Sequence, residues 1–214
     1  MRTPATLVLA LGLVGAALAQ EVVYDNTTTS LDQNFPLLPS WEVESAEAGD
    51  EIWLGGSART VTELKLIFNY RGTLPGTLDA LIRFREYDQN FQGPGAAFYE
   101  SPLTQVQTTA GLHDLTFSIP GVVVPDHFIW TIQVFNRQGS DGELGMAYFN
   151  PPTVGSSEDW LWQRGGNEWT AYSWGAEPYA NFGARLTAVP EPATLSLFAT
   201  GLLLLRRRRL NNIH

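Results

Sequence analysis

The sequence predicts an all-β protein, built as an antiparallel β-sandwich or jelly roll. Three observations lead to this fold class. Several segments alternate apolar and polar residues with period two, as half-buried strands do. Turn sequences that contain Gly and Pro separate these segments. Between the two ends of the chain, no stretch keeps the 3.6-residue period of an amphipathic helix.

Four segments alternate most regularly. In residues 61–70, Leu64, Leu66 and Phe68 share one face, and the polar residues Glu63, Lys65 and Asn69 share the other. The same pattern predicts strands at residues 80–87, 127–135 and 180–188. Less regular alternation predicts further strands at residues 20–24, 51–54, 113–119, 144–149 and 169–172. Short strands at this spacing are typical of a sandwich or jelly roll.

Two segments lack the alternating pattern. The polar stretch at residues 27–40 predicts a loop, and a short helix is an alternative for residues 41–48. We expect the strands and loops to form one domain at residues 20–188. The chain has no cysteine, so this domain must be stable from packing alone, which a domain of this size can achieve.

The predicted domain is strongly acidic. Residues 20–188 hold 21 of the 22 Asp and Glu residues but only eight of the 13 Lys and Arg residues. Such a surface repels nucleic acid and anionic lipid headgroups, so we expect no nucleic-acid partner. The absence of cysteine also excludes thiolate catalysis and Cys-ligated zinc.

The N-terminus predicts a signal peptide at residues 1–19, with a helical apolar segment. Arg2 supplies the positive charge, and residues 5–18 are apolar except for Thr6. Ala17 and Ala19 form a small-x-small cleavage site, followed by polar residues. The mature chain is therefore expected to begin at Gln20, outside the cytoplasm.

The C-terminus, residues 189–214, reads as a separate segment with three parts. Pro190, Glu191 and Pro192 end the domain, because two closely spaced prolines fit neither a helix interior nor a central strand. An apolar run at residues 193–205 follows and predicts a short hydrophobic helix. The run is shorter than the ~20 residues of a normal membrane span. Four consecutive arginines close it and are expected to stay cytoplasmic: Arg206, Arg207, Arg208 and Arg209.

This tail resembles the PEP-CTERM sorting signal of Gram-negative bacteria that produce exopolysaccharide. The resemblance covers roughly the last 22 residues only, through the Pro-Glu-Pro motif, the apolar run and the arginines together. It implies that a membrane enzyme, exosortase, processes the tail near Pro190, Glu191 and Pro192. The implied location is the cell envelope, cell surface or extracellular space, with transient or retained anchoring in the inner membrane. The domain is also similar, at residues 22–26, 124–131 and 151–157, to PEP-CTERM proteins of unknown biochemistry.

Four tryptophans gather in one part of the sequence: Trp160, Trp162, Trp169 and Trp174. Trp160 and Trp162 share a face if their segment is a strand. Aromatic rings beside carboxylates and amides stack against sugar rings and bind their hydroxyl groups, so this region is a possible carbohydrate site. The alternative, which the sequence favours, is that these rings pack in the core or form cross-strand pairs.

No catalytic or metal-binding constellation stands out. His113 and His127 each lie beside an acid at a strand start and are expected on the surface. Glu158 and Asp159 would point to opposite faces of a strand, so they are not expected to share a glycosidase site. The acids in the N-terminal third lack the spacing of a calcium loop and are expected to form a solvated face.

The sequence therefore favours an exported, envelope-sorted and non-enzymatic protein of the cell surface or extracellular matrix, without a cofactor. Two alternatives stay open. One is a carbohydrate-binding module that uses the tryptophan-rich region, with exopolysaccharide as a possible partner. The other is an exported glycoside hydrolase, which needs two carboxylates in one cleft.

Overall fold

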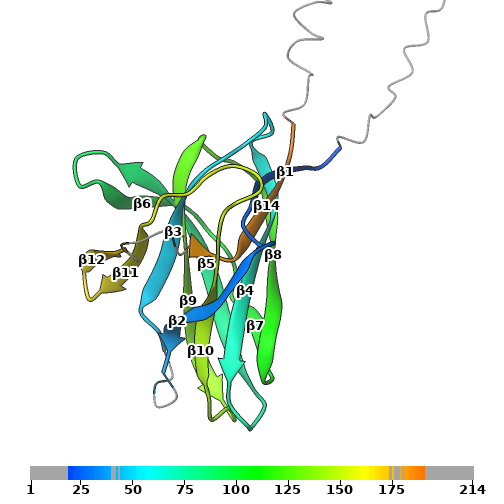
Figure 1. The fold of residues 1–214 in the computed structure, drawn as a ribbon, viewed down its shortest axis with the longest axis vertical. Coiled ribbons are helices and arrows are strands. Elements are labelled where there is room, and N and C mark those ends of the chain that lie inside the picture. The colour runs from blue at the N-terminus through cyan, green and yellow to red at the C-terminus, as the bar shows by residue number, and fades with distance from the viewer. Residues whose placement is uncertain are drawn as a thin grey trace, which may run out of the picture.

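A computed structural model describes residues 19–39, 42, 44–173, 175, 179 and 181–190 of the chain. Over these residues the protein is all-β, and every pair of neighbouring strands is antiparallel, as predicted (Figure 1). The predicted signal helix and the predicted C-terminal hydrophobic helix lie outside the described residues. Within the described part, none of the chain forms a helix with the length and apolar character that a membrane crossing requires.

The strands form two sheets of seven strands each. The first sheet is centred on β4, which pairs with β8 along one edge and with β14 and β10 along the other. Its strands are β1 (Glu21–Asp25), β14 (Ala184–Val189), β4 (Thr60–Arg71), β10 (Glu143–Phe149), β13 (Asn181–Phe182), β2 (Ser30–Leu38) and β8 (Gly111–Val123).

The second sheet has β9 and β5 at its centre, and β6 and β7 share the outer edge of β5. Its strands, in spatial order, are β12 (Glu168–Tyr172), β11 (Leu161–Gly165), β3 (Glu47–Trp53), β9 (His127–Gln138), β5 (Gly76–Asp88) and β6 (Gly93–Glu100), and β7 (Thr104–Thr108) also pairs with β5.

One hydrophobic core lies between the sheets. Alternation places Phe128, Trp130 and Ile132 of β9 on the inner face, where each is at most 2% exposed. Across the gap they meet residues of the first sheet, including Phe182, whose ring centroid is 5.9 Å from that of Trp130. The two sheets therefore bury one another's apolar faces, as in other β-sandwiches.

A buried carboxylate also connects the sheets. Asp50 of β3 is fully buried and accepts a hydrogen bond of 2.9 Å from the backbone N–H of Phe182 in the first sheet. It also accepts bonds from the N–H of Glu51 and the hydroxyl of Ser157. Burial raises the pKa of Asp50 well above its ordinary value, and these three donors offset part of that rise.

Gly49 allows β3 to lie close to β9. A Cβ atom at this position would collide with the backbone oxygen of Trp130 and would lie 2.7 Å from the Cα of Thr131. We expect Gly49→Ala to force the two strands apart and to lower the free energy of unfolding by about 1–3 kcal/mol, as overpacking does. Urea unfolding followed by tryptophan fluorescence measures this change. Gly165→Ala is the control, because a Cβ there meets no atom within 4 Å; an equal loss in both variants would contradict the argument.

All nine predicted strands coincide with observed strands, although Gly183 divides residues 180–188 into β13 and β14. The loop predicted at residues 27–40 is wrong, because β2 forms there and pairs with β10. The helix alternative for residues 41–48 is also wrong where the structure describes it. Glu47 and Ala48 begin β3 and pair with Arg164 and Gln163 of β11, so hydrogen bonding to neighbouring strands replaces a local helical turn.

The first and last strands of the domain are neighbours. β1 pairs with β14 through Glu21–Ala188 and Val22–Thr187. Because the pair is antiparallel, β1 begins and β14 ends at the same end of the sandwich (Figure 1). The chain therefore enters β1 and leaves β14 side by side.

Candidate functional site

A pocket with a volume of about 390 Å³ opens on the outer face of the second sheet. It combines aromatic side chains with two carboxylates. Phe91 and Trp160 are the exposed rings, at 52% and 44% exposure. The lining residues are Glu51, Tyr87, Phe91, Gln92, Glu158, Trp160, Trp162 and Ala171.

Backbone geometry holds the aromatic side chains of this pocket in place. Trp162 of β11 is only 6% exposed and lies against Gly93 of β6, where a Cβ would come within 2.7 Å of the indole ring. Phe91 lies in the turn between β5 and β6, which the Asp88 carboxylate stabilises by accepting a 2.8 Å bond from the N–H of Asn90. The centroids of Phe91 and Trp162 are 6.3 Å apart. Trp162 therefore forms a fixed wall, while Phe91 and Trp160 offer exposed ring surface.

Glu51 is the more buried of the two pocket carboxylates. Its Oε1 lies 2.7 Å from Nε2 of His127, whose ring stacks on Trp53 at a centroid distance of 4.0 Å. Burial raises the pKa of Glu51, and the charge of Glu158 adds to the rise, while His127 opposes it. The indole N–H of Trp162 also lowers this pKa, although it completes no hydrogen bond of normal geometry.

A second pocket, of about 420 Å³, adjoins the first because Phe91 lines both. Its other lining residues are Asp88, Pro94, Asn167, Glu168 and Trp169. The guanidinium carbons of Arg85 and Arg164 lie 5.2 and 5.9 Å from the ring centroid of Trp169, as cation–π contacts. Two pockets with aromatic and acidic lining therefore lie next to one another on this face.

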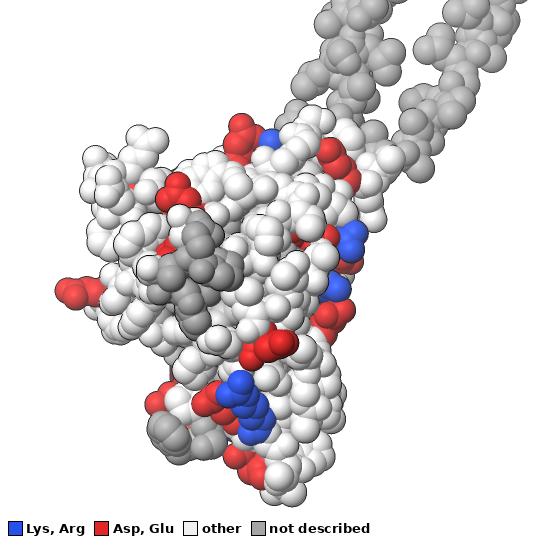
Figure 2. All heavy atoms as spheres, viewed as in Figure 1, with Lys and Arg blue, Asp and Glu red and all other residues white. Residues whose placement is uncertain are grey.

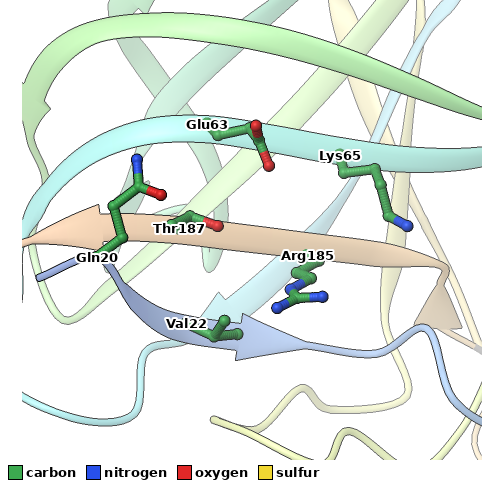
Figure 3. A pocket seen from close by; sticks show the side chains of 6 residues that line it. All are labelled: Gln20, Val22, Glu63, Lys65, Arg185 and Thr187. Carbon is green, nitrogen blue, oxygen red and sulfur yellow. The ribbon is translucent and has the colours of Figure 1, made fainter.

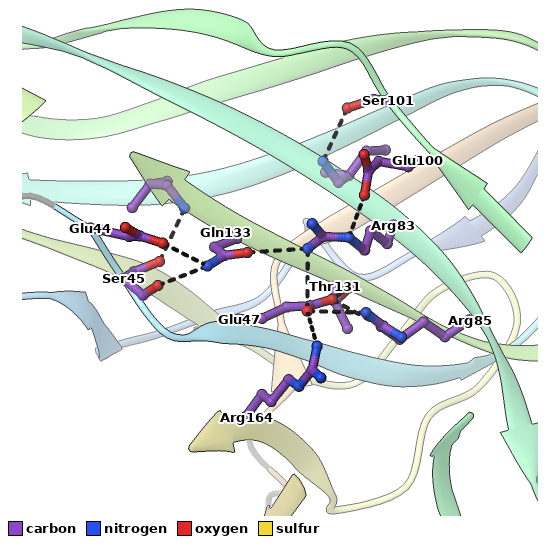
Figure 4. Close-up of polar contacts among 12 residues, drawn as sticks. Glu44, Ser45, Glu47, Arg83, Arg85, Glu100, Ser101, Thr131, Gln133 and Arg164 are labelled. Carbon is purple, nitrogen blue, oxygen red and sulfur yellow. Dashed lines mark hydrogen bonds and ion pairs between the residues drawn. The ribbon is translucent and has the colours of Figure 1, made fainter. Parts of the chain in front are cut away.

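An ion-pair network beside these pockets organises the same face (Figure 4). Glu47 is 3% exposed, and arginines from two strands converge on it. Arg85 Nε is 2.9 Å, Arg83 Nη1 is 3.2 Å and Arg164 Nη1 is 3.7 Å from its carboxylate oxygens. Burial alone would raise the pKa of Glu47, but the hydrogen bonds from Arg85 and Thr131 and the charges of Arg85 and Arg83 outweigh it and hold the pKa below its ordinary value.

The first sheet carries a third pocket on its own outer face, beside the start of β1 (Figure 3). Lys65 and Arg185 lie next to one another there because β4 and β14 pair in this register. Both cations already have acidic partners: Lys65 Nζ is 2.8 Å from Asp114, and Arg185 Nε is 3.7 Å from Asp25. These ion pairs leave little unpaired positive charge for an anionic ligand.

The surface agrees with the acidic composition. Figure 2 shows Asp and Glu side chains spread over the visible face, with fewer Lys and Arg among them. Within the described residues, no group of three or more His, Asp or Glu side chains is arranged to hold a metal ion.

The structure brings two of the predicted carbohydrate-site residues together. Trp160 and Trp162 line the same pocket, and Trp169 lines the adjoining one. Trp162 is also buried, as the packing alternative predicted, whereas Trp160 is exposed. Trp174 lies outside the described residues.

The sorting and cleavage residues are described only at the domain boundary. Pro190 directly follows β14, and Ala19 is exposed before β1. The other predicted residues of the two terminal segments lie outside the described part of the chain: Ala17, Glu191, Pro192, Arg206, Arg207, Arg208 and Arg209.

The two adjacent acids are separated, as predicted. Glu158 lines the pocket, whereas Asp159 is 9% exposed and accepts hydrogen bonds from Ser173 and the N–H of Gly175. Sequence reasoning did not identify Glu51 as the second carboxylate of the pocket. Strand alternation in β3 puts Glu51 on one face with Glu47 and Trp53, but no local signal shows that this face meets β11.

Comparison with known proteins identifies the C-terminal segment alone. The family model described as "PEP-CTERM protein-sorting motif" matches residues 188–209. The match implies export, sorting to the cell envelope and processing by exosortase. No curated protein and no solved structure matches the chain.

Proposed function

We propose that this chain is a non-enzymatic protein of the cell surface or extracellular matrix, and that its β-sandwich binds carbohydrate. The observation that carries the proposal is the pocket in which Trp160 and Phe91 expose ring surface beside Glu51 and Glu158. The C-terminal motif supports delivery of this pocket to the cell envelope.

The chemistry of the pocket fits a sugar. The apolar face of a pyranose ring packs on an indole or phenyl ring, and its hydroxyl groups donate to carboxylates and amides. Trp160 and Phe91 supply the ring surfaces, and Glu51, Glu158 and Gln92 supply the polar partners. Trp162 and its packing against Gly93 keep the pocket wall rigid, which reduces the entropy lost on binding.

Replacing Trp160 tests this proposal. We expect Trp160→Ala to weaken binding of a glycan-panel ligand by about tenfold, because an exposed stacking ring is lost. Titration of the protein purified from its host, followed by tryptophan fluorescence and calorimetry, measures the affinity.

Tyr172→Ala is the matched control. Tyr172 is also 44% exposed, but its ring contacts Phe35 of the first sheet, and it is not among the residues that line the pocket. Affinity unchanged in Trp160→Ala, or no binding to any member of a broad glycan panel, would count against the proposal.

A glycoside hydrolase is the second candidate, because Glu51 and Glu158 line one pocket and burial raises the pKa of Glu51. A general acid needs a raised pKa beside a second carboxylate. Release of reducing ends from a glycan that binds, lost in Glu158→Gln, would favour this candidate over the non-enzymatic one.

A further inference from the structure

The two pockets on either side of Phe91 are both lined by carboxylates. The first is lined by the carboxylates Glu51 and Glu158, and the second by Asp88 and Glu168. Neither pocket has Lys or Arg among its lining residues within the described part of the chain. A ligand that occupies both pockets therefore meets four carboxylates at the pocket walls, while Arg85 and Arg164, which pair with Glu47, lie against the Trp169 ring of the second pocket.

Two of these carboxylates are available to a ligand. Glu51 is already paired with His127, and Asp88 stabilises the turn that carries Phe91. Glu158 and Glu168 are exposed, and within the described residues neither side chain forms an ion pair. One available carboxylate thus lies in each pocket.

The indole N–H of Trp162 lies at the wall of the first pocket, near the carboxylate of Glu51. Trp162 is 94% buried, and its indole N–H has no hydrogen-bond partner of normal geometry. Buried donors without partners are rare in folded proteins because each one costs about 1–3 kcal/mol. A hydroxyl oxygen of a ligand in the pocket is a suitable acceptor for this N–H.

Building on the proposed carbohydrate binding, we infer that the ligand is a polysaccharide whose sugars carry free, protonated amino groups. An ammonium group on a sugar pairs with Glu158 and lies over the exposed ring of Trp160, where the ring quadrupole also attracts it. A uronic acid in the same position would place like charges together, which opposes binding. Charge thus selects amino sugars over acidic ones, while the exposed rings hold any pyranose.

Three oligosaccharides of equal length test the inference: a fully deacetylated glucosamine oligomer, its N-acetylated counterpart and an oligogalacturonate. Calorimetry with the protein purified from its host, just below neutral pH and at low salt, measures each affinity. We expect the deacetylated oligomer to bind at least about fivefold more tightly than the N-acetylated one, and the galacturonate to be rejected. Added salt is expected to reduce the preference.

Glu158→Gln separates charge from shape, because it keeps the side-chain size. We expect this variant to lose the preference for the deacetylated oligomer and to retain affinity for the N-acetylated one. Glu86→Gln is the control, since Glu86 is exposed but lines neither pocket.

Equal affinity for the two glucosamine oligomers, or tighter binding of the galacturonate, would overturn the inference and leave the proposed function standing. Binding to other members of the glycan panel but to none of these three would also overturn it. Absence of binding to the entire panel contradicts the proposed function itself.

Discussion

Deletion of residues 190–209 is expected to abolish sorting of the protein to the cell envelope and to release or misplace it. The deletion removes the Pro-Glu-Pro motif, the apolar run and the four arginines, which together form the matched sorting motif after the end of β14. Cell fractionation and immunoblotting of host cells that express the variant measure its location. We expect an all-or-none change rather than a graded one, because the whole signal is lost.

The structure makes this experiment interpretable. β14 ends at Val189, whose pairing partner is Thr60, so the deletion removes no paired residue of the sandwich. The thermal unfolding of the purified variant should match that of the intact protein. Deletion of residues 210–214 is the control, since these residues follow the matched motif. Unchanged fractionation of the 190–209 deletion would refute the role of the tail.

Replacement of Glu47 has the largest expected effect on stability. Glu47→Ala leaves Arg83, Arg85 and Arg164 without their shared partner beneath the outer face of the second sheet. Removing one member of a buried ion-pair network costs about 3–5 kcal/mol, because the remaining charges stay desolvated. A typical domain is stable by about 5–15 kcal/mol, so the variant should be marginally folded. Urea unfolding measures the difference.

The lowered pKa of Glu47 adds a pH signature to this prediction. The unfolded chain binds a proton to Glu47 at a higher pH than the folded protein does, so the stabilisation is present near neutral pH and is lost as the pH falls through the folded-state pKa. The gap in stability between the wild type and Glu47→Gln should therefore narrow in acid. Glu44→Ala is the control, because Glu44 is exposed and makes one long bond to Gln133. A gap that is constant with pH would contradict this account.

The fold class was predictable because half-buried strands leave a period-two pattern in the sequence. The missed strand β2 lies at an edge of β10, and its polar residues, together with Pro36, resemble a loop. The alternation in β6 is obscured by Gly93 and Gly95 near its start. Edge strands and glycine-rich strands bury few side chains, so local pattern says little about them.

Only part of the candidate site could be predicted from the sequence, for a similar reason. Trp160 and Trp162 stand out in the sequence, since large aromatic residues are conspicuous at any position. Glu51 joins Glu158 through the pairing of β3 with β11, a contact between segments about 110 residues apart. Glu47 likewise depends on arginines from two other strands. Tertiary contacts of this kind have no signature in one sequence.

The pairing of β1 with β14 also bears on how the chain folds after export. The first strand of the domain to be synthesised, β1, pairs with the last strand, β14, and β14 in turn completes one edge of β4. The first sheet therefore cannot close until almost the whole domain has been translocated. Contacts between such distant segments form slowly. The chain should thus remain unfolded during passage through the membrane and fold cooperatively once its C-terminal strand emerges.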